Sequence, residues 1–455
     1  MKLSTHLNGK SFTFKNINDV LAKANEPKSA DRFQKIAASS VTERIAAKIV
    51  LSELTIQDLT ENPSVPYEKD EVTRVNIDGM NKVAYEQIKG MTIGEFRNWI
   101  LDHKTTTEIL RRYHRAFPGE VAAATAKIMS AMDLVYAASK ITVVTRCNTM
   151  VGLPGTLSYR LQTNSTTDDP QTILLGVMEG VSYGSGDACF GINPVEDNVN
   201  STRRIADGLY DFMQKFEIPT QIVVLSHMTT QMEAMSQGAP LSMIFQSIAG
   251  TGPAIDNFGV NTQLCRDAYA LARQNSIASG PNLLYFETGQ GSEVSIAADC
   301  GVDEMTLEAR TYGFARNFDP FMVNNVSGFI GPETIYDGKE ILRANLEDHF
   351  MGKLMGLPMG MAPCFTNHTS INKDDQEMAT ALLAMAGANF YMGVPVSDDI
   401  MLAYVDTSFH DDATLRELTH KKPAPEFHKW LMKHDLMDEN GILTEKAGDG
   451  SIFLK

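Results

Sequence analysis

Residues 283–293 read Leu283-Leu-Tyr-Phe-Glu287-Thr-Gly-Gln-Gly-Ser-Glu293, and this stretch sets the expectation for the fold. Four residues of strand type run directly into the carboxylate of Glu287, and a Thr-Gly-Gln-Gly loop follows. Buried parallel strands have apolar runs of this kind, and functional groups of barrel enzymes stand at the carboxyl ends of such strands. The alternative is a glutamate that merely begins a solvated loop. The two interpretations differ in whether polar residues at the other strand ends gather at the same point.

Beyond about residue 155, short strand-like runs alternate with helix-like segments. The eight strand-like runs are residues 156–162, 188–193, 221–226, 241–247, 283–287, 321–326, 361–366 and 389–394. Helix-like segments such as residues 169–180, 303–316 and 373–386 lie between them. We therefore predict an α/β fold, a (β/α)₈ TIM barrel. A doubly wound open sheet is the alternative, but no strand-like run leads into G-x-G-x-x-G or G-x-x-x-x-G-K-[ST].

Three regions are expected along the chain. Residues 1–150 have helical apolar spacing, for example in residues 41–54, and are predicted to be a helical N-terminal region. Residues 151–420 form the barrel with the active site. Residues 421–455 begin with Lys421-Lys-Pro-Ala-Pro and are predicted to be a short C-terminal extension.

Composition narrows the class of protein. The 455 residues are 43% hydrophobic and carry a formal charge of -16, which disfavours nucleic acid and anionic membranes as partners. The apolar run at residues 378–396 is better explained by a buried helix and a strand than by a membrane span. The chain starts without an apolar signal region, and its scattered cysteines contain no CxxC pair. We therefore expect reduced thiols in a cytoplasmic protein. The cysteines are Cys147, Cys189, Cys265, Cys300 and Cys364.

Polar residues stand at the ends of most predicted strands. They are Arg160 and Gln162, Asn193, His227, Ser247, Glu287, Asn325, Asn367 and His368, with Met392 near the end of the last strand. One cation, one carboxylate and several amides suit a small polar molecule with separate donors and acceptors. No Ser-His-Asp order stands out. His227, Asn367, His368 and Glu287 lack the tight spacing of a metal site, so no metal is predicted.

Seven segments resemble the large subunit of ethanolamine ammonia-lyase, in family order and over essentially the whole chain. They are Pro154-Gly-Thr-Leu-Ser-Tyr-Arg-Leu-Gln162, Gly186-Asp-Ala-Cys-Phe-Gly-Ile-Asn-Pro194, Ile244-Phe-Gln-Ser247, Tyr285-Phe-Glu-Thr-Gly-Gln-Gly-Ser292, Gly328-Phe-Ile-Gly-Pro-Glu333, Leu346-Glu-Asp-His-Phe-Met-Gly-Lys353 and Thr407-Ser-Phe-His-Asp-Asp-Ala-Thr414. The chain is identified as a divergent member of that family.

The resemblance implies a (β/α)₈ barrel that works with a small (light) subunit, which completes a site for adenosylcobalamin. In such enzymes an adenosyl radical takes hydrogen from the carbon bearing the substrate hydroxyl, and an aldehyde and ammonia result. It further implies a homo-oligomer of large subunits and a location in the cytoplasm or inside a bacterial microcompartment. No D-x-H-x-x-G sequence is present, in keeping with the base-on cobalamin of this family.

The family's functional positions carry over one by one. Arg160, Glu287 and Asn193 correspond to catalytic residues, and Gln162, Met392 and Ala362 complete the substrate pocket. The residues around the adenosyl group correspond to Ser247, Asn257, Phe258, Phe329 and again Asn193. The resemblance implies that Glu287 accepts hydrogen bonds from the substrate, that Arg160 stabilises charge in the transition state, and that Arg160 bonded to Gln162 holds the pocket's shape.

Two positions depart from the family. Ala362 replaces an acidic residue that engages the substrate ammonium, and Asn257 replaces a glutamate near the adenosyl ribose. Loss of a charge-assisted partner commonly costs about 2–5 kcal/mol. Three interpretations therefore stay open: an ethanolamine ammonia-lyase, a same-fold radical eliminase for a different amino alcohol or polyol, and a catalytically weak paralogue that serves as an assembly partner.

Overall fold

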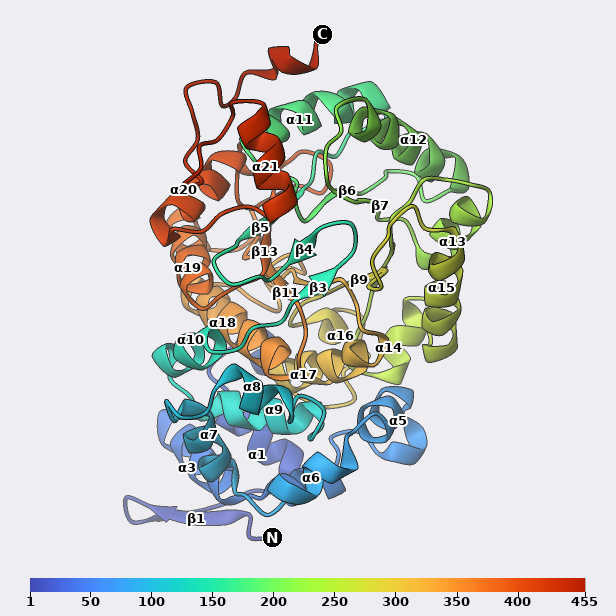
Figure 1. Ribbon diagram of the computed structural model, residues 1–455. Helices are drawn as coiled ribbons and strands as arrows, with labels where there is room; N and C mark the ends of the chain where they lie inside the picture. Colours follow the sequence, from blue (N-terminus) through green and yellow to red (C-terminus); the bar gives the residue numbers. More distant parts are fainter. Residues whose placement is uncertain (455) are drawn as a thin grey trace.

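The computed structural model describes residues 1–454 and contains a barrel of eight parallel strands (Figure 1). The strands are β5 (Ser158–Leu161), β6 (Cys189–Ile192), β7 (Ile222–Val224), β8 (Ile244–Ser247), β9 (Leu284–Thr288), β10 (Met322–Asn325), β11 (Met359–Met361) and β13 (Phe390–Gly393). Except for β7 and β8, which are the two ends of the sheet, each pairs with the next in sequence order, and β13 pairs back onto β5. Between β7 and β8, Ser242 N donates to Ile222 O at 2.9 Å. The prediction of a (β/α)₈ barrel is confirmed.

The seventh barrel strand begins and ends earlier than expected. The sequence indicated residues 361–366, whereas β11 is Met359–Met361. Gly360 lies in this strand and leaves room for β13, since a Cβ at position 360 would lie 2.0 Å from the Phe390 ring. Pro363 lacks an N–H and cannot extend the ladder, so the chain leaves the barrel at this point.

A small antiparallel sheet lies beyond the barrel. It consists of β12 (Phe365–Thr366), β15 (Tyr404–Val405) and β14 (Asp398–Asp399), with β15 in the middle. The part predicted as the end of a barrel strand therefore belongs to this sheet. The sheet brings residues 398–406, which follow the last barrel strand, against the segment that follows β11.

Helices surround the barrel (Figure 1). They include α11 (Pro170–Ser182), α12 (Val199–Lys215), α13 (Met228–Ser236), α15 (Thr262–Asn275), α17 (Glu304–Ala315), α18 (Gly338–Leu354), α19 (Lys373–Met385) and α20 (Phe409–Thr419). Polar side chains cap their N-termini; Asn372 and Asp375, for example, form a reciprocal capping box at α19. All twelve residues of α17 are buried, because the N-terminal helices cover the side of α17 that a barrel helix ordinarily exposes.

The N-terminal residues contain mainly helices. They include α1 (Ile17–Ala24), α3 (Val41–Glu53), α5 (Glu71–Asp78), α7 (Ile93–Leu101), α9 (Gly119–Lys127) and α10 (Ala131–Ser139). The sequence analysis missed a hairpin of β1 (Ser4–Leu7) and β2 (Lys10–Thr13), at the N-terminus in Figure 1. Its turn is Asn8-Gly9 with φ angles of 52° and 77°, the left-handed geometry that Asn-Gly adopts in two-residue hairpin loops.

The final residues return to the start of the barrel. Leu157 N donates to Lys422 O at 2.9 Å, and α21 (Pro425–Lys433) follows. The Trp430 indole N–H then donates to Phe216 O at 2.8 Å, which fixes α21 near the end of α12. No helix within residues 1–454 has both the length and the apolar character required to cross a membrane.

Candidate active site

A cavity of about 440 Å³ opens at the carboxyl end of the barrel strands. It contains most of the side chains that the sequence places at strand ends, namely Arg160, Gln162, Asn193, His227, Ser247, Glu287 and Met392. Phe258 and Phe329, which the family resemblance places around the adenosyl group, also line it. The volume is within the range typical of pockets for small ligands. Residues far apart in sequence therefore meet in one cavity.

Arg160 and Glu287 form the centre of this cavity. The Nη1 atom of Arg160 lies 2.5 Å from Oε1 of Glu287, although the two residues belong to strands on different sides of the barrel. Nη1 also lies 3.0 Å from the Met392 sulfur, and Nη2 donates to Gly191 O at 3.2 Å. Gly191 has to be small, because a Cβ there would stand 2.5 Å from Nε of Arg160.

One oxygen of Glu287 accepts three hydrogen bonds. Besides Arg160, the Tyr285 hydroxyl donates to Oε1, and Asn324 Nδ2 donates to it at 3.1 Å. Within residues 1–454, Oε2 has no hydrogen-bond donor, and the Glu287 side chain keeps 14% of its exposure, toward the cavity that it lines. The carboxylate is therefore fixed through one oxygen and presents the other to a ligand.

The surroundings of Arg160 favour its protonated, positively charged form. Burial by itself disfavours a charged guanidinium, but Tyr285 and Glu287 outweigh burial and raise the pKa of Arg160 above its ordinary value. Its Nε atom is buried without a partner among the described residues. Arg160 is thus a permanent, almost fully buried cation at the deep end of the cavity.

Gln162 does not bond to Arg160, which corrects one expectation. Its amide nitrogen instead donates to Oδ2 of Asp399 and to the Tyr404 hydroxyl, each at 2.7 Å. Asn164 donates to the same Asp399 oxygen at 2.7 Å. Gln162 therefore connects the first barrel strand to the small antiparallel sheet, and the shape of the cavity depends on that sheet rather than on an Arg160–Gln162 contact.

Asn193 lies at the end of β6, partly buried and on the cavity wall. Its backbone N–H donates to Asn164 Oδ1 at 2.8 Å. Its side-chain amide has no hydrogen-bond partner among residues 1–454, so its donor and its acceptor are both available to a ligand.

Three residues expected at the site lie elsewhere. Asn325 is buried outside the cavity, where it donates to Asp348 Oδ2 at 2.7 Å and to the Tyr312 hydroxyl at 3.1 Å. Asn367 and His368 are exposed and do not line the cavity. Successive residues of a strand point to opposite faces, so the Asn325 side chain points away from the cavity. Its neighbour Asn324 is the residue that faces Glu287.

The two positions that depart from the family pattern have different surroundings. Ala362 is fully buried and packs with Cys364, Met392 and Tyr404 in a small apolar cluster at the cavity wall. Asn257 is exposed and is not among the lining residues, whereas Phe258 beside it is.

Several residues of the site were missed. Tyr285 and Asn324 bond to Glu287, and an inward-facing period of two along their strands could have identified them. Cys364 and Tyr404 also line the cavity. No local sequence signal marks them, since the small antiparallel sheet brings them there.

The chain was compared with known proteins. Residues 12–446 match the family model of the ethanolamine ammonia lyase large subunit. The chain is 49% identical over 453 residues to the ethanolamine ammonia-lyase large subunit of Escherichia coli strain K12, and the match covers 100% of both chains. It is 48% identical over 453 residues to the protein of the same name from Salmonella typhimurium strain LT2, again over 100% of both.

Proposed function

The chain belongs to the ethanolamine ammonia-lyase large-subunit family, and from this premise we propose that it is the catalytic subunit of an adenosylcobalamin-dependent ammonia-lyase. The proposed reaction converts ethanolamine, or a related amino alcohol, to an aldehyde and ammonia. The observation that carries the proposal is the 2.5 Å pair of Arg160 and Glu287, in which Oε2 of Glu287 remains available inside the cavity.

The pocket chemistry matches a small amino alcohol. Oε2 of Glu287 can accept from a hydroxyl or an ammonium group, and the ion pair with Arg160 keeps the carboxylate oriented. The free amide of Asn193 can donate to one substrate group and accept from another. The guanidinium of Arg160 can stabilise negative charge that develops in the transition state, because it is preorganised and shielded from water.

The residues toward the opening fit the adenosyl part of the cofactor. Phe258 and Phe329 are aromatic walls against which a purine can pack, and Ser247 adds a hydroxyl for a polar sugar. Phe329 is braced by Tyr404, with ring centroids 5.3 Å apart. When bound, the cofactor supplies the power to abstract hydrogen from an unactivated carbon. The chain's own residues bind the substrate, orient it and exclude water.

The proposal includes partners and a location. A small subunit would cover the exposed part of the cofactor, and large subunits would assemble with one another. The enzyme would work in the cytoplasm or inside a bacterial microcompartment. A different amino alcohol or a polyol is the second candidate substrate, because Ala362 contributes no charge to the pocket. A catalytically weak assembly partner is the third candidate.

Reconstitution tests the proposal. The large and small subunits are combined with adenosylcobalamin, and absorbance is followed after adding ethanolamine, N-methylethanolamine or ethylene glycol. We expect a cob(II)alamin signal and acetaldehyde with ethanolamine. A signal with another compound alone would replace the substrate assignment. No signal with any of them, in a properly assembled complex, would leave the assembly-partner interpretation.

A further inference from the structure

Asp406 is a buried acid that the proposed reaction does not yet use. It follows β15 and has no exposed surface. Its Oδ1 atom accepts from Thr407 N at 2.8 Å, while Oδ2 has no hydrogen-bond partner among residues 1–454. Buried carboxyl oxygens are seldom left unpaired, because water is lost without compensation. An unpaired buried oxygen beside a ligand cavity therefore requires an explanation.

The small antiparallel sheet turns Asp406 toward the cavity. Phe365 pairs with Val405, so the register continues to Cys364 opposite Asp406. Val405 packs against the cluster that contains Phe365, away from the cavity. Side chains alternate along a strand, so Tyr404 and Asp406 share the other face. Cys364 and Tyr404 line the cavity, which places Asp406 directly behind its wall.

The segment around Asp406 is fixed to the last barrel strand. The Thr407 hydroxyl donates to Met392 O, and Val394 N donates to Thr407 O at 2.9 Å. Met392 belongs to the apolar cluster that also holds Ala362, Cys364 and Tyr404. Asp406 and Ala362 therefore flank the same side chains, and the acid stands beside the position where the family carries its own.

Charged and titratable groups surround Asp406 on every packed element: Arg160, Cys364, Lys373, Asp399, Tyr404 and Asp412. Lys373 donates to Asp411 Oδ2 and to the Asp406 carbonyl rather than to its carboxyl group. Burial raises the pKa of Asp406 to about 8, against the lowering effect of Thr407 N, Lys373 and Arg160. In the empty site at pH 7 this carboxyl group is therefore mostly protonated.

We propose that Asp406 is the second acid of the substrate site and a specificity-determining residue, whose charge attracts the substrate ammonium from behind the wall formed by Cys364 and Tyr404. This inference rests on the proposed function and assigns to Asp406 the part that Ala362 cannot play. An ammonium in the cavity favours the ionised carboxylate. Binding at pH 7 should then release a proton from Asp406, and affinity should rise as the pH approaches 8.

Calorimetry tests this proposal without turnover. Ethanolamine is titrated into the complex of large and small subunits at pH 7, in two buffers of different ionisation enthalpy. We expect the wild-type complex to release close to one proton, and Asp406→Asn to bind ethanolamine at least tenfold more weakly without that release. Because the proton count needs only the wild-type chain, the test stands even if the variant fails to fold.

Two controls separate charge from structure. Asp398→Asn removes an exposed acid of the same small sheet and should leave ethanolamine binding unchanged. Ethylene glycol carries no charge, so its binding should be alike in wild type and Asp406→Asn. Equal weakening for both ligands, or no proton release in the wild type, would overturn the role of Asp406. A wild-type complex that does not bind ethanolamine would instead overturn the proposed substrate and this inference together.

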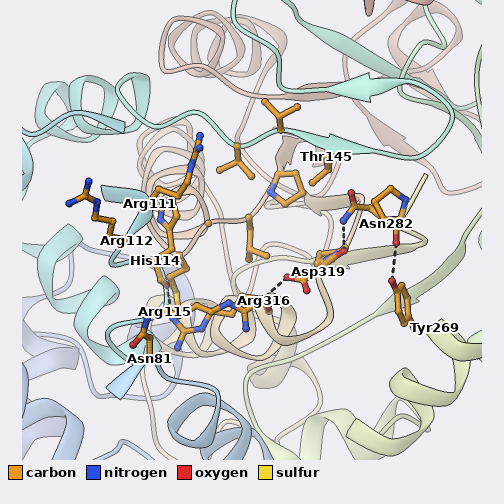
Figure 2. A pocket seen from close by; sticks show the side chains of 18 residues that line it. Asn81, Arg111, Arg112, His114, Arg115, Thr145, Tyr269, Asn282, Arg316 and Asp319 are labelled. Carbon is orange, nitrogen blue, oxygen red and sulfur yellow. Dashed lines mark hydrogen bonds and ion pairs between the residues drawn. The ribbon is translucent and has the colours of Figure 1, made fainter. Parts of the chain in front are cut away.

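A second, independent feature is a cavity of about 500 Å³ at the opposite end of the barrel (Figure 2). Its wall includes Pro358, which directly precedes β11. It also includes Asn282 and Asp319, which lie shortly before the first residues of β9 and β10. The active-site residues follow the strands instead. The two cavities therefore share no lining residue.

This second cavity is strongly basic in an acidic protein. Four arginines line it, Arg111, Arg112, Arg115 and Arg316, together with a single acid, Asp319. Asp319 is already paired, at 2.8 Å from Nη2 of Arg115 (Figure 2). The chain as a whole carries a formal charge of -16, so this concentration of positive charge runs against the protein's overall charge.

Among residues 1–454, no carboxylate forms an ion pair or hydrogen bond with Arg316. Its side chain is 2% exposed and donates within these residues to carbonyl oxygens, those of His114 at 2.9 Å and Asn76 at 3.4 Å, while its Nε atom has no partner there. Burial and the nearby Arg115 lower the pKa of Arg316 to about 9, against the raising effect of Glu120, which is itself paired with Arg310. Burial lowers the pKa of His114 to about 4. A buried guanidinium without a bonded carboxylate favours an anion at this site.

We infer that this cavity binds a small polyvalent anion of the phosphate-ester type. Guanidinium groups recognise phosphate oxygens by paired, charge-assisted hydrogen bonds, and a concave pocket of this volume favours a small molecule over a flat macromolecular surface. The ligand would neutralise Arg316 and connect the N-terminal residues to the base of the barrel.

Inorganic pyrophosphate is the probe for this site. We expect it to raise the thermal unfolding midpoint of the assembled protein in a saturable, salt-sensitive manner, and Arg111→Gln to weaken its binding at least tenfold. Arg203→Gln, which changes an exposed arginine outside this cavity, should have no effect. No stabilisation by pyrophosphate, or an equal loss in both variants, would overturn the inference.

Discussion

Glu287→Gln is expected to lower kcat/KM for ethanolamine by about two to three orders of magnitude in the reconstituted two-subunit enzyme. The change keeps the shape of the side chain but removes its charge. The substrate ammonium then loses its carboxylate, and Arg160 loses the one ion-pair partner it has among residues 1–454. Truncating one partner of a buried charge pair costs about 2–5 kcal/mol, and each 1.4 kcal/mol corresponds to a factor of ten.

Steady-state kinetics on the folded variant measure this effect. Leaving Arg160 uncompensated also destabilises the barrel, so the thermal midpoint has to be recorded and assays run well below it. Glu377→Gln is the matched control, because that side chain is exposed on α19. A change in kcat/KM of less than about threefold would show that Glu287 does not bind the reacting substrate.

Arg310→Met is expected to have the largest effect on stability. Arg310 is fully buried on α17, where it contacts Asp70 Oδ2 at 2.7 Å and Glu120 Oε1 at 2.6 Å. Both acids lie in the N-terminal region and are themselves buried. Removing the guanidinium leaves two buried carboxylates without their cation, which costs about 3–5 kcal/mol or more.

Urea unfolding, followed by circular dichroism, measures the loss. Arg266→Met serves as the control because Arg266 is exposed on α15 and should change the free energy of unfolding by less than about 0.5 kcal/mol. Equal midpoints for Arg310→Met and wild type would mean that the ion pairs of Arg310 do not help to hold the N-terminal helices to the barrel.

Much of the site could be predicted because strand ends are a local signal. In Leu283-Leu-Tyr-Phe-Glu287, the apolar run ends at the carboxylate of the candidate site, and the structure places Glu287 against Arg160. The prediction that Asn325 faces the cavity was wrong, because the neighbouring Asn324 of the same strand faces it instead. Side-chain parity depends on pairing with β9, where Asn324 stands opposite Glu287.

The sequence by itself determined the barrel, the order of its strands and the polar residues at their ends, since local apolar periodicity and turn chemistry encode these features. Only the tertiary structure decided that Gln162 bonds to Asp399 and Tyr404, that β11 ends at Met361, and that Asp406 is fully buried. The physical reason is that these contacts depend on how residues 398–406 pack over the barrel. That packing depends on burial and strand pairing between residues far apart in the sequence, so it cannot be predicted from a local segment.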